Sequence, residues 1–207
     1  MKEIIVAITG ASGAIYAGRL LRALLMGGHN VHLVLSKYGR LLLHEELGFN
    51  PDRESVRGFL VRLYGKDLEK GDIREYTVGD QSSTIASGSA MIDGMVIVPC
   101  SIKTLSGVAN AYADNLIERA ADVTLKERRP LVLVVRETPL NLIHLRNMTS
   151  VTEAGGTVLP AMPAFYQSPK NFDDLGDFIA GRVLSVFGME HDLFPSWTGL
   201  KNKKLEK

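Results

Sequence analysis

The amino-acid sequence predicts an α/β protein: a Rossmann-like, doubly wound, mostly parallel sheet flanked by helices in three layers. Short apolar runs rich in β-branched residues alternate along the chain with segments of helical periodicity. The apolar runs are continuous, as in strands that helices cover on both faces. Small and hydroxyl-bearing residues follow several of these runs, and ligands of such sheets bind at the carboxyl ends of the strands.

The individual elements follow from these patterns. Five apolar runs are expected to be strands: residues 3–8, 31–36, 94–99, 131–135 and 157–161. Apolar residues at helical spacing predict six helices: residues 14–26, 38–47, 53–64, 103–127, 140–154 and 173–187. The first helix is expected to end at Gly27-Gly28. Residues 65–92, rich in Gly, Ser, Asp and Thr, give the least certain pattern.

Length and composition indicate one domain over residues 1–207, with a basic tail from about residue 200 that is expected to be solvated or disordered. The net charge of +1 gives no support for nucleic-acid binding. No apolar run approaches the roughly 18 residues of a membrane helix. A single cysteine suits a reducing compartment, so a cytoplasmic protein is expected.

The turn after the first strand, TGASG (residues 9–13), has two interpretations. Small residues let a backbone approach a ligand closely, and the following helix offers unpaired N–H groups and a positive dipole end. The alternative is a tight strand-to-helix turn that needs glycine only to bend. The glycines do not match the G-x-G-x-x-G of dinucleotide binders.

Polar residues follow the other strands too. Ser36 comes after the second run, Ser101 to Thr104 lie in PCSIKTLSG, Arg136 and Glu137 follow LVLVV, and Tyr166 lies in MPAFYQ. Together these strand ends predict a site for a large, flat, phosphorylated ligand at one edge of the sheet.

Three further cations are candidates for that site. Arg119 and Lys126 are seven residues apart on one predicted helix, so they share a face, and Arg182 lies on the last helix. Ordinary surface charges remain the alternative for each of them, and for Lys126 the nearby helix C-terminus offers a complete explanation.

Three segments of the chain resemble the UbiX-type flavin prenyltransferases. They are TGASGAIYAGRLL, VPCSIKTLSGVANAYADNLIERAADVTLKERRPLVLVVRETPLNLIHLRNM and PAFYQSPKNFDDL. The resemblance covers nearly the whole chain apart from residues 50–85 and the basic tail. The long central segment is highly specific, whereas the opening turn alone is not.

The resemblance implies a flavoprotein domain and an enzyme that takes reduced FMN and dimethylallyl phosphate. Such an enzyme joins the five-carbon unit to N5 and C6 of the flavin. The product, prenylated FMN, is the cofactor of UbiD-type decarboxylases, which are the implied partners. The resemblance also implies a large homo-oligomer, commonly a dodecamer, with active sites at subunit junctions.

The resemblance further implies roles for individual residues. The implied FMN contacts are Gly10, Ala11, Ser12, Ser36, Ser101, Ile102, Lys103, Thr104 and Arg136. The implied prenyl-phosphate contacts are Ser87, Arg119, Lys126, Tyr166 and Arg182. Glu137 resembles the acid–base residue, Ser12 belongs to a proton relay, Glu46 is a further carboxylate of the site, and Trp197 resembles an aromatic lid. The adjacent Glu45 leaves the register of Glu46 open.

The chemistry of the reaction fits these residue types. Phosphate leaves with its bonding electrons, so basic side chains stabilise the departing anion. Tyr166 and Trp197 are candidates for an aromatic wall that faces the allylic cation. The ring carbon then loses a proton, and either Glu137 or the departing phosphate is a plausible acceptor.

Three features mimic other chemistry. DDLGD (residues 173–177) matches the aspartate motif that holds magnesium in many prenyl-diphosphate enzymes, but its place in the first turn of the last helix favours a dipole-complementing role. His44 has no second histidine at the spacing of a zinc helix, so no metal site is expected. Cys100 closes a buried strand and is expected to be a core residue.

Two other functions stay open at this stage. One is an FMN-dependent decarboxylase of peptidyl cysteine, although the nearest stretch to that group's Pro-x-Met-Asn-x-x-Met-Trp motif, PAMPAFY, lacks the asparagine. The other is a non-catalytic FMN carrier. The four residues Arg119, Lys126, Tyr166 and Arg182 argue against a carrier, because storage of FMN needs no second phosphate site.

Overall fold

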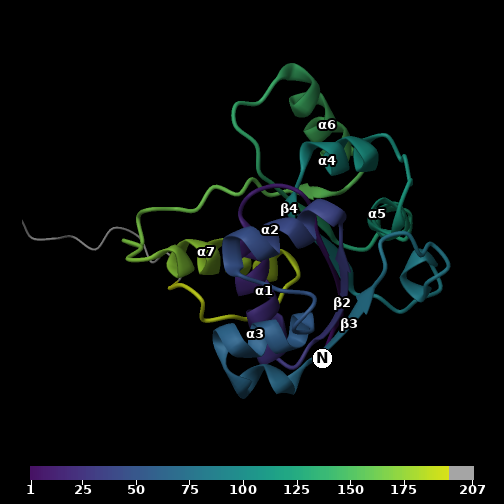
Figure 1. Cartoon of the computed structure of the whole chain (residues 1–207). Coiled ribbons are helices and arrows are strands. Elements are labelled where there is room, and N and C mark those ends of the chain that lie inside the picture. Colours follow the sequence, from purple (N-terminus) through teal and green to yellow (C-terminus); the bar gives the residue numbers. More distant parts are fainter. Residues whose placement is uncertain (196–207) are drawn as a thin grey trace, which may run out of the picture.

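A six-stranded parallel sheet forms the centre of the computed structural model, which describes residues 1–195 (Figure 1). Its strand order is β3-β2-β1-β4-β5-β6, and every neighbouring pair is parallel. The strands are β1 (Glu3–Ile8), β2 (Asn30–Leu35), β3 (Asp72–Tyr76), β4 (Gly94–Cys100), β5 (Leu131–Val135) and β6 (Thr157–Val158). The predicted doubly wound α/β architecture is therefore confirmed.

Helices cover both faces of this sheet. One face carries α1 (Ala14–Met26), α2 (Lys37–Leu47), α3 (Val56–Tyr64) and α7 (Phe172–Val186). The other carries α4 (Ile102–Ala109), α5 (Leu116–Lys126) and α6 (Leu142–Glu153). In Figure 1, α7 lies beside α1, while α6 lies against α4. Short 3₁₀ segments run over Lys66–Lys70 and Thr84–Ala86.

Successive side chains of β1 point into two separate cores. Ile4, Val6 and Ile8 pack into the core under α1 and α7, whereas Ile5 and Ala7 pack into the core under α4 and α5. This alternation follows from the two-residue period of a strand. It explains the continuous apolar run, because both faces of the sheet are buried.

Three details of the predicted elements are corrected. The single helix expected over residues 103–127 is two helices, because Ala111 adopts a positive φ of 51° and the Asn115 side chain starts α5 by accepting from the N–H groups of Ile117 and Glu118. The strand expected over residues 157–161 is assigned only to Thr157–Val158, immediately before Leu159-Pro160.

The third correction is β3, which lies within the stretch that gave no clear pattern. Only one of its five residues, Tyr76, is buried, and the others are partly or fully exposed. An edge strand of this kind lacks the continuous apolar run of a central strand, so its sequence DIREY does not reveal it.

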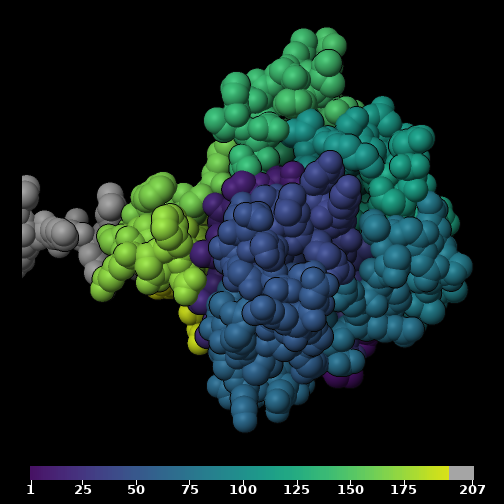
Figure 2. All heavy atoms as spheres, in the orientation of Figure 1, coloured from purple at the N-terminus to yellow at the C-terminus, as the bar shows by residue number. Residues whose placement is uncertain are grey.

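Helices and loops of residues 37–64 cover the centre of the face seen in Figure 2. The segment near residue 165 and the start of α7 project at one side of that view. Within residues 1–195, every helix is too short or too polar to span a bilayer.

Candidate binding site at the carboxyl end of the sheet

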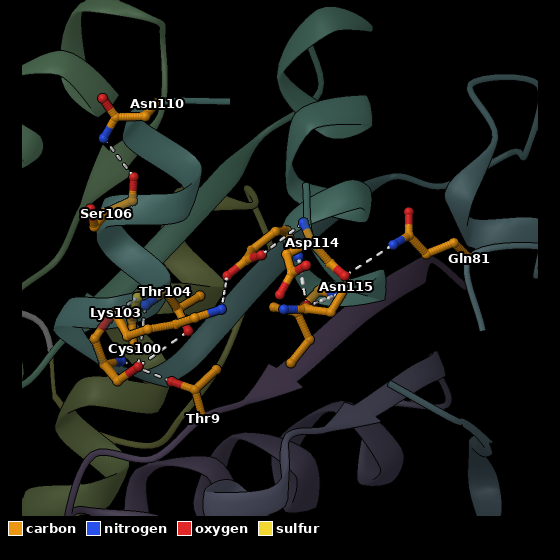
Figure 3. A network of polar contacts seen from close by, with 12 residues as sticks. Thr9, Gln81, Cys100, Lys103, Thr104, Ser106, Asn110, Asp114 and Asn115 are labelled. Carbon is orange, nitrogen blue, oxygen red and sulfur yellow. Dashed lines mark hydrogen bonds and ion pairs between the residues drawn. The ribbon is translucent and has the colours of Figure 1, made fainter. Parts of the chain in front are cut away.

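The order of the strands reverses at β1, which lies between β2 and β4. The loops that leave β1 and β4 therefore diverge to opposite faces, and a crevice between such loops is where open α/β sheets bind ligands. Thr9 ties the two loops together. Its Oγ1 donates to the carbonyl oxygen of Pro99 at 2.8 Å and accepts from the N–H of Ser101 at 2.8 Å. Figure 3 shows Thr9 close to Cys100, at the end of β4.

Packing within the chain accounts for two glycines of the first turn. A Cβ on Gly10 would lie 2.5 Å from Cβ of Tyr38, and Gly13 has a φ of 114°, with the ring of Tyr16 against it. The tight-turn interpretation is thus sufficient for both. The turn still offers donors to a ligand, since the N–H groups of Gly10 and Ser12 donate no hydrogen bond within residues 1–195.

Glu46 occupies the N-terminus of α1. Its Oε2 accepts from the N–H groups of Gly13 at 2.9 Å and Ala14 at 2.7 Å. A carboxylate there is favoured by the helix dipole. Glu45 turns instead to His44 on the exposed surface, at 3.1 Å. The structure therefore places Glu46, and not Glu45, beside the turn of Ser12.

The start of α4 supplies a second group of backbone donors. Ser101 is the N-cap, and its Oγ accepts from the N–H of Thr104. The N–H groups of Ile102 and Lys103, in the first turn, donate no hydrogen bond within the described residues. These two free N–H groups at a helix N-terminus fit an anion such as a phosphate.

The side chain of Lys103 turns away from this group of donors. Its Nζ lies 2.6 Å from Oε1 of Glu118, a buried carboxylate of α5, and Figure 3 shows it pointing toward Asp114 and Asn115. Glu118 also accepts from the N–H of Asp114 at 3.1 Å. The ammonium of Lys103 thus neutralises a buried charge, and only the backbone of Lys103 faces the candidate site.

Ser36 begins α2 at the carboxyl end of β2. Its Oγ accepts from the N–H of Gly39 at 2.9 Å. Beside it lies a cavity of about 430 Å³, lined in part by Lys37, Arg40 and Tyr76. Arg40 is paired with Glu75, which leaves Lys37 as the cation of this cavity without an ion-pair partner among the described residues.

Arg136 and Glu137 extend the site from the end of β5. Arg136 Nε donates to the carbonyl oxygen of Ser12 at 2.9 Å, so it bridges β5 to the first turn. Glu137 is half-buried, and its Oε1 accepts from the N–H of Thr138 at 2.9 Å. Both residues are therefore at the same edge as the turn of Ser12, as predicted.

Tyr16 belongs to this site although sequence reasoning missed it. Its ring lies against Gly13, at 2.7 Å between Cε2 and the position a Cβ would take. Burial raises the pKa of the Tyr16 phenol. The positive charge of Arg136 opposes this rise in pKa, and the negative charge of Glu46 adds to it. A tyrosine in the first turn of the helix, four residues after Ser12, is the pattern that could have revealed it, because helical side chains point back toward the N-terminus.

Three of the five residues expected at the prenyl phosphate do come together. Arg119 Nε donates to the carbonyl oxygen of Ala86 at 3.2 Å, next to Ser87. A Cβ on Gly88 would lie 2.8 Å from Lys126 Nζ. The loop of Ser87 therefore lies along α5. Within the chain, Arg119 pairs with Asp122 at 3.0 Å, and Lys126 pairs with Glu127.

The other two residues lie on the opposite face of the sheet. Arg182 is exposed on α7, and Tyr166 is half-exposed with its ring edge-on to Phe178 of α7, at a centroid distance of 6.3 Å. Because α5 and α7 cover different faces, one chain does not bring Lys126 and Arg182 together. Trp197, the expected lid, lies outside the described residues.

The aspartate motif is structural. Asp173 and Asp174 lie in the first turn of α7, as predicted, and Asp173 and Asp177 bind the guanidinium of Arg19. Nowhere in the described part of the chain do three His, Cys, Asp or Glu side chains gather as a metal site would require. Cys100 is fully buried, and burial raises the pKa of its thiol, so the prediction of a core residue is confirmed.

Comparison with known proteins places these features in a family. Residues 1–184 match the Flavoprotein family. A relative from Methanothermobacter thermautotrophicus, named flavin prenyltransferase UbiX, is 48% identical over 199 residues, which cover 96% of this chain and 97% of the relative.

Two solved structures are similar over almost the whole chain. AnUbiX, crystallised in complex with FMN and dimethylallyl pyrophosphate, is 40% identical with a TM-score of 0.85, covering 97% of this chain and 99% of that protein. A dodecameric, FMN-dependent UbiX-like decarboxylase from Escherichia coli O157:H7 is 42% identical with a TM-score of 0.82, covering 95% of this chain and 100% of that protein.

Proposed function

The chain belongs to the UbiX-type flavin prenyltransferases, so it is an enzyme that prenylates FMN, and we propose how its own residues carry the reaction. It joins a dimethylallyl unit, from dimethylallyl phosphate, to N5 and C6 of reduced FMN. The assignment of residues rests on one observation: two groups of backbone N–H donors lie where the loops after β1 and β4 diverge to opposite faces of the sheet. The cysteine decarboxylase and carrier alternatives are not favoured.

Backbone N–H groups and hydroxyls hold the flavin in this proposal. The N–H donors are those of Gly10 and Ser12 in the turn after β1 and those of Ile102 and Lys103 at the start of α4, where Ser101 and Thr104 add hydroxyls. Ser36 at the start of α2 adds a hydroxyl, and Arg136 adds a guanidinium already anchored to the first turn. Such fixed donors suit a phosphate and a polar ring edge, because they need little reorganisation on binding.

The second phosphate belongs to the prenyl substrate, and two chains of a homo-oligomer bind it. One chain supplies Ser87, Arg119 and Lys126, and another supplies Tyr166 and Arg182. The support is geometric, since the two groups lie on opposite faces of one chain. The cations then stabilise the leaving phosphate. To do so, Lys126 exchanges its exposed pairing with Glu127 for the substrate, a small change because surface ion pairs are weak.

The carboxylates Glu46 and Glu137 handle protons. Reduced FMN supplies the nucleophilic N5 and C6. Glu46 lies at the turn of Ser12, and Glu137 extends from the same edge of the sheet, so in this proposal both carboxylates take part in moving the proton that the flavin releases. Trp197 is proposed as the aromatic lid.

The assembly and the cellular role are inferred from the relatives. We propose a dodecamer, as in the similar E. coli structure. A UbiD-type decarboxylase is proposed as the recipient of prenylated FMN because the resemblance of the sequence to its family implies that partner. A cytoplasmic location is proposed because the single cysteine is a buried thiol, which suits a reducing compartment.

An anaerobic reaction tests the function. The protein is mixed with reduced FMN and dimethylallyl phosphate, and the flavin is analysed by mass spectrometry. A gain of one five-carbon unit is expected, and a parallel reaction with the diphosphate shows which leaving group is accepted. A flavin of unchanged mass with both donors, under verified reducing conditions, would refute the proposal.

A further inference from the structure

Tyr16 carries an inference beyond the roles proposed above. It is the third residue of α1, and its N–H donates to the carbonyl oxygen of Gly13 at 3.0 Å. Its ring points back toward the turn after β1 (residues 9–13) and lies against Gly13. The half-buried ring also packs on the core under α1, so its position is fixed by packing on one side.

Two charged groups of the site bind the same few residues. Arg136 Nε donates to the carbonyl oxygen of Ser12, and the Glu46 carboxylate accepts from the N–H groups of Gly13 and Ala14. The ring of Tyr16 lies against Gly13, next to the residues that these two charged groups contact. Arg136 lowers the pKa of the phenol and Glu46 raises it. A phenol, a guanidinium and a carboxylate thus converge on residues 12–14.

The hydroxyl of Tyr16 makes no hydrogen bond within residues 1–195. The Glu46 carboxylate already accepts hydrogen bonds from two backbone N–H groups, so it does not need one from the phenol. A phenol is protonated near neutral pH, and burial raises the pKa of Tyr16 further, so its hydroxyl acts as a donor rather than as a base. A donor beside Arg136 suits an acceptor that carries negative charge.

We propose that the Tyr16 hydroxyl is a binding group of the flavin site, and that it donates a hydrogen bond which favours reduced over oxidised flavin. This inference rests on the proposed function. Reduced flavin carries negative charge on its ring near neutral pH, whereas oxidised flavin is neutral. A hydrogen bond to an anion is stronger than one to a neutral acceptor, so the hydroxyl discriminates between the two forms.

Anaerobic titrations of Tyr16→Phe with reduced and with oxidised FMN test the proposal. We expect about tenfold weaker binding of reduced FMN and a change below about threefold for oxidised FMN, since one hydrogen bond to a charged group is lost. The midpoint potential of the bound flavin should fall accordingly. Equal losses for both forms, or no loss for either, would overturn the proposal.

Tyr64→Phe is the matched control. Tyr64 is also half-buried against the core under α1, beside a charged residue, Arg19, but away from the first turn. The Tyr64→Phe variant should bind reduced and oxidised FMN with the affinities of the wild-type protein. Tyr16→His keeps a ring N–H donor in a smaller side chain and should retain part of the preference for reduced FMN. This variant keeps the test decisive if Tyr16→Phe folds poorly.

The two proposals fail in different ways. Wild-type protein that discriminates between flavin forms through Tyr16 but never adds a prenyl unit would refute the prenyl transfer and leave the role of Tyr16 intact. Wild-type protein that prenylates FMN while Tyr16→Phe keeps the full preference for reduced FMN would refute only the inference on Tyr16.

Discussion

The Arg19 ion pair allows a quantitative prediction about the aspartate motif. Arg19 lies on α1 and is 9% exposed. Its Nε donates to Oδ1 of Asp177 at 2.6 Å, and a second N–H contacts the other oxygen, so this pair is bidentate. Burial alone would lower the pKa of Arg19, but the hydrogen bond and charge of Asp177, helped by Asp173, raise it instead.

Asp177→Ala should therefore be far more destabilising than Asp173→Ala. The Asp177 side chain is 14% exposed, and removing one partner of a buried pair costs about 3–5 kcal/mol. Since Asp173 still contacts Arg19 at 3.1 Å, we expect the low end, about 3 kcal/mol. Asp173 is 55% exposed, so its removal should cost about 0.5 kcal/mol.

Thermal unfolding at one fixed protein concentration is the assay, because oligomerisation makes the midpoint concentration-dependent. For a chain of this size, about 3 kcal/mol corresponds to a fall of about 6–12 °C for Asp177→Ala. Equal midpoints for Asp177→Ala and Asp173→Ala would refute the structural role. A rise of the wild-type midpoint with magnesium that both variants abolish would instead support a metal site.

Three further predictions concern the site and the core. Glu46→Gln should lower the rate of prenylation at least about 100-fold, because a neutral amide cannot accept a proton. The control Glu45→Gln should leave that rate unchanged when both are measured by mass spectrometry. Equal rates for the two variants would contradict the placement of Glu46 in the site. Lys126→Ala and Arg182→Ala should each lower the rate of prenylation about 100-fold. If two subunits share a site, oligomers assembled from a mixture of the two variants should regain activity. Mixed oligomers as inactive as either variant alone would argue against a shared site. Native Cys100 should resist iodoacetamide at pH 8, because burial raises the pKa of its thiol, and mass spectrometry showing alkylation without unfolding would contradict its core position.

The sequence by itself determined the parallel sheet and the edge at which polar residues gather. The β-branched runs of β1, β4 and β5 are buried on both faces, and burial of that kind leaves a continuous apolar pattern. The carboxyl ends of parallel strands share an edge, so Ser36, Ser101 and Arg136 were placed there without knowledge of side-chain contacts. The edge strand β3 escaped because it buries almost nothing.

The tertiary structure decided which partners the polar residues take. Sequence spacing could not show that Glu46 reaches the start of α1, that Lys103 neutralises Glu118, or that Tyr16 lies over the first turn. Each contact joins residues whose side-chain directions depend on how separate elements pack. Lys126 and Arg182 are likewise separated because α5 and α7 cover opposite faces of the sheet. The spacing of residues along one helix shows which of them share a face of that helix, but not which face of the sheet the helix covers.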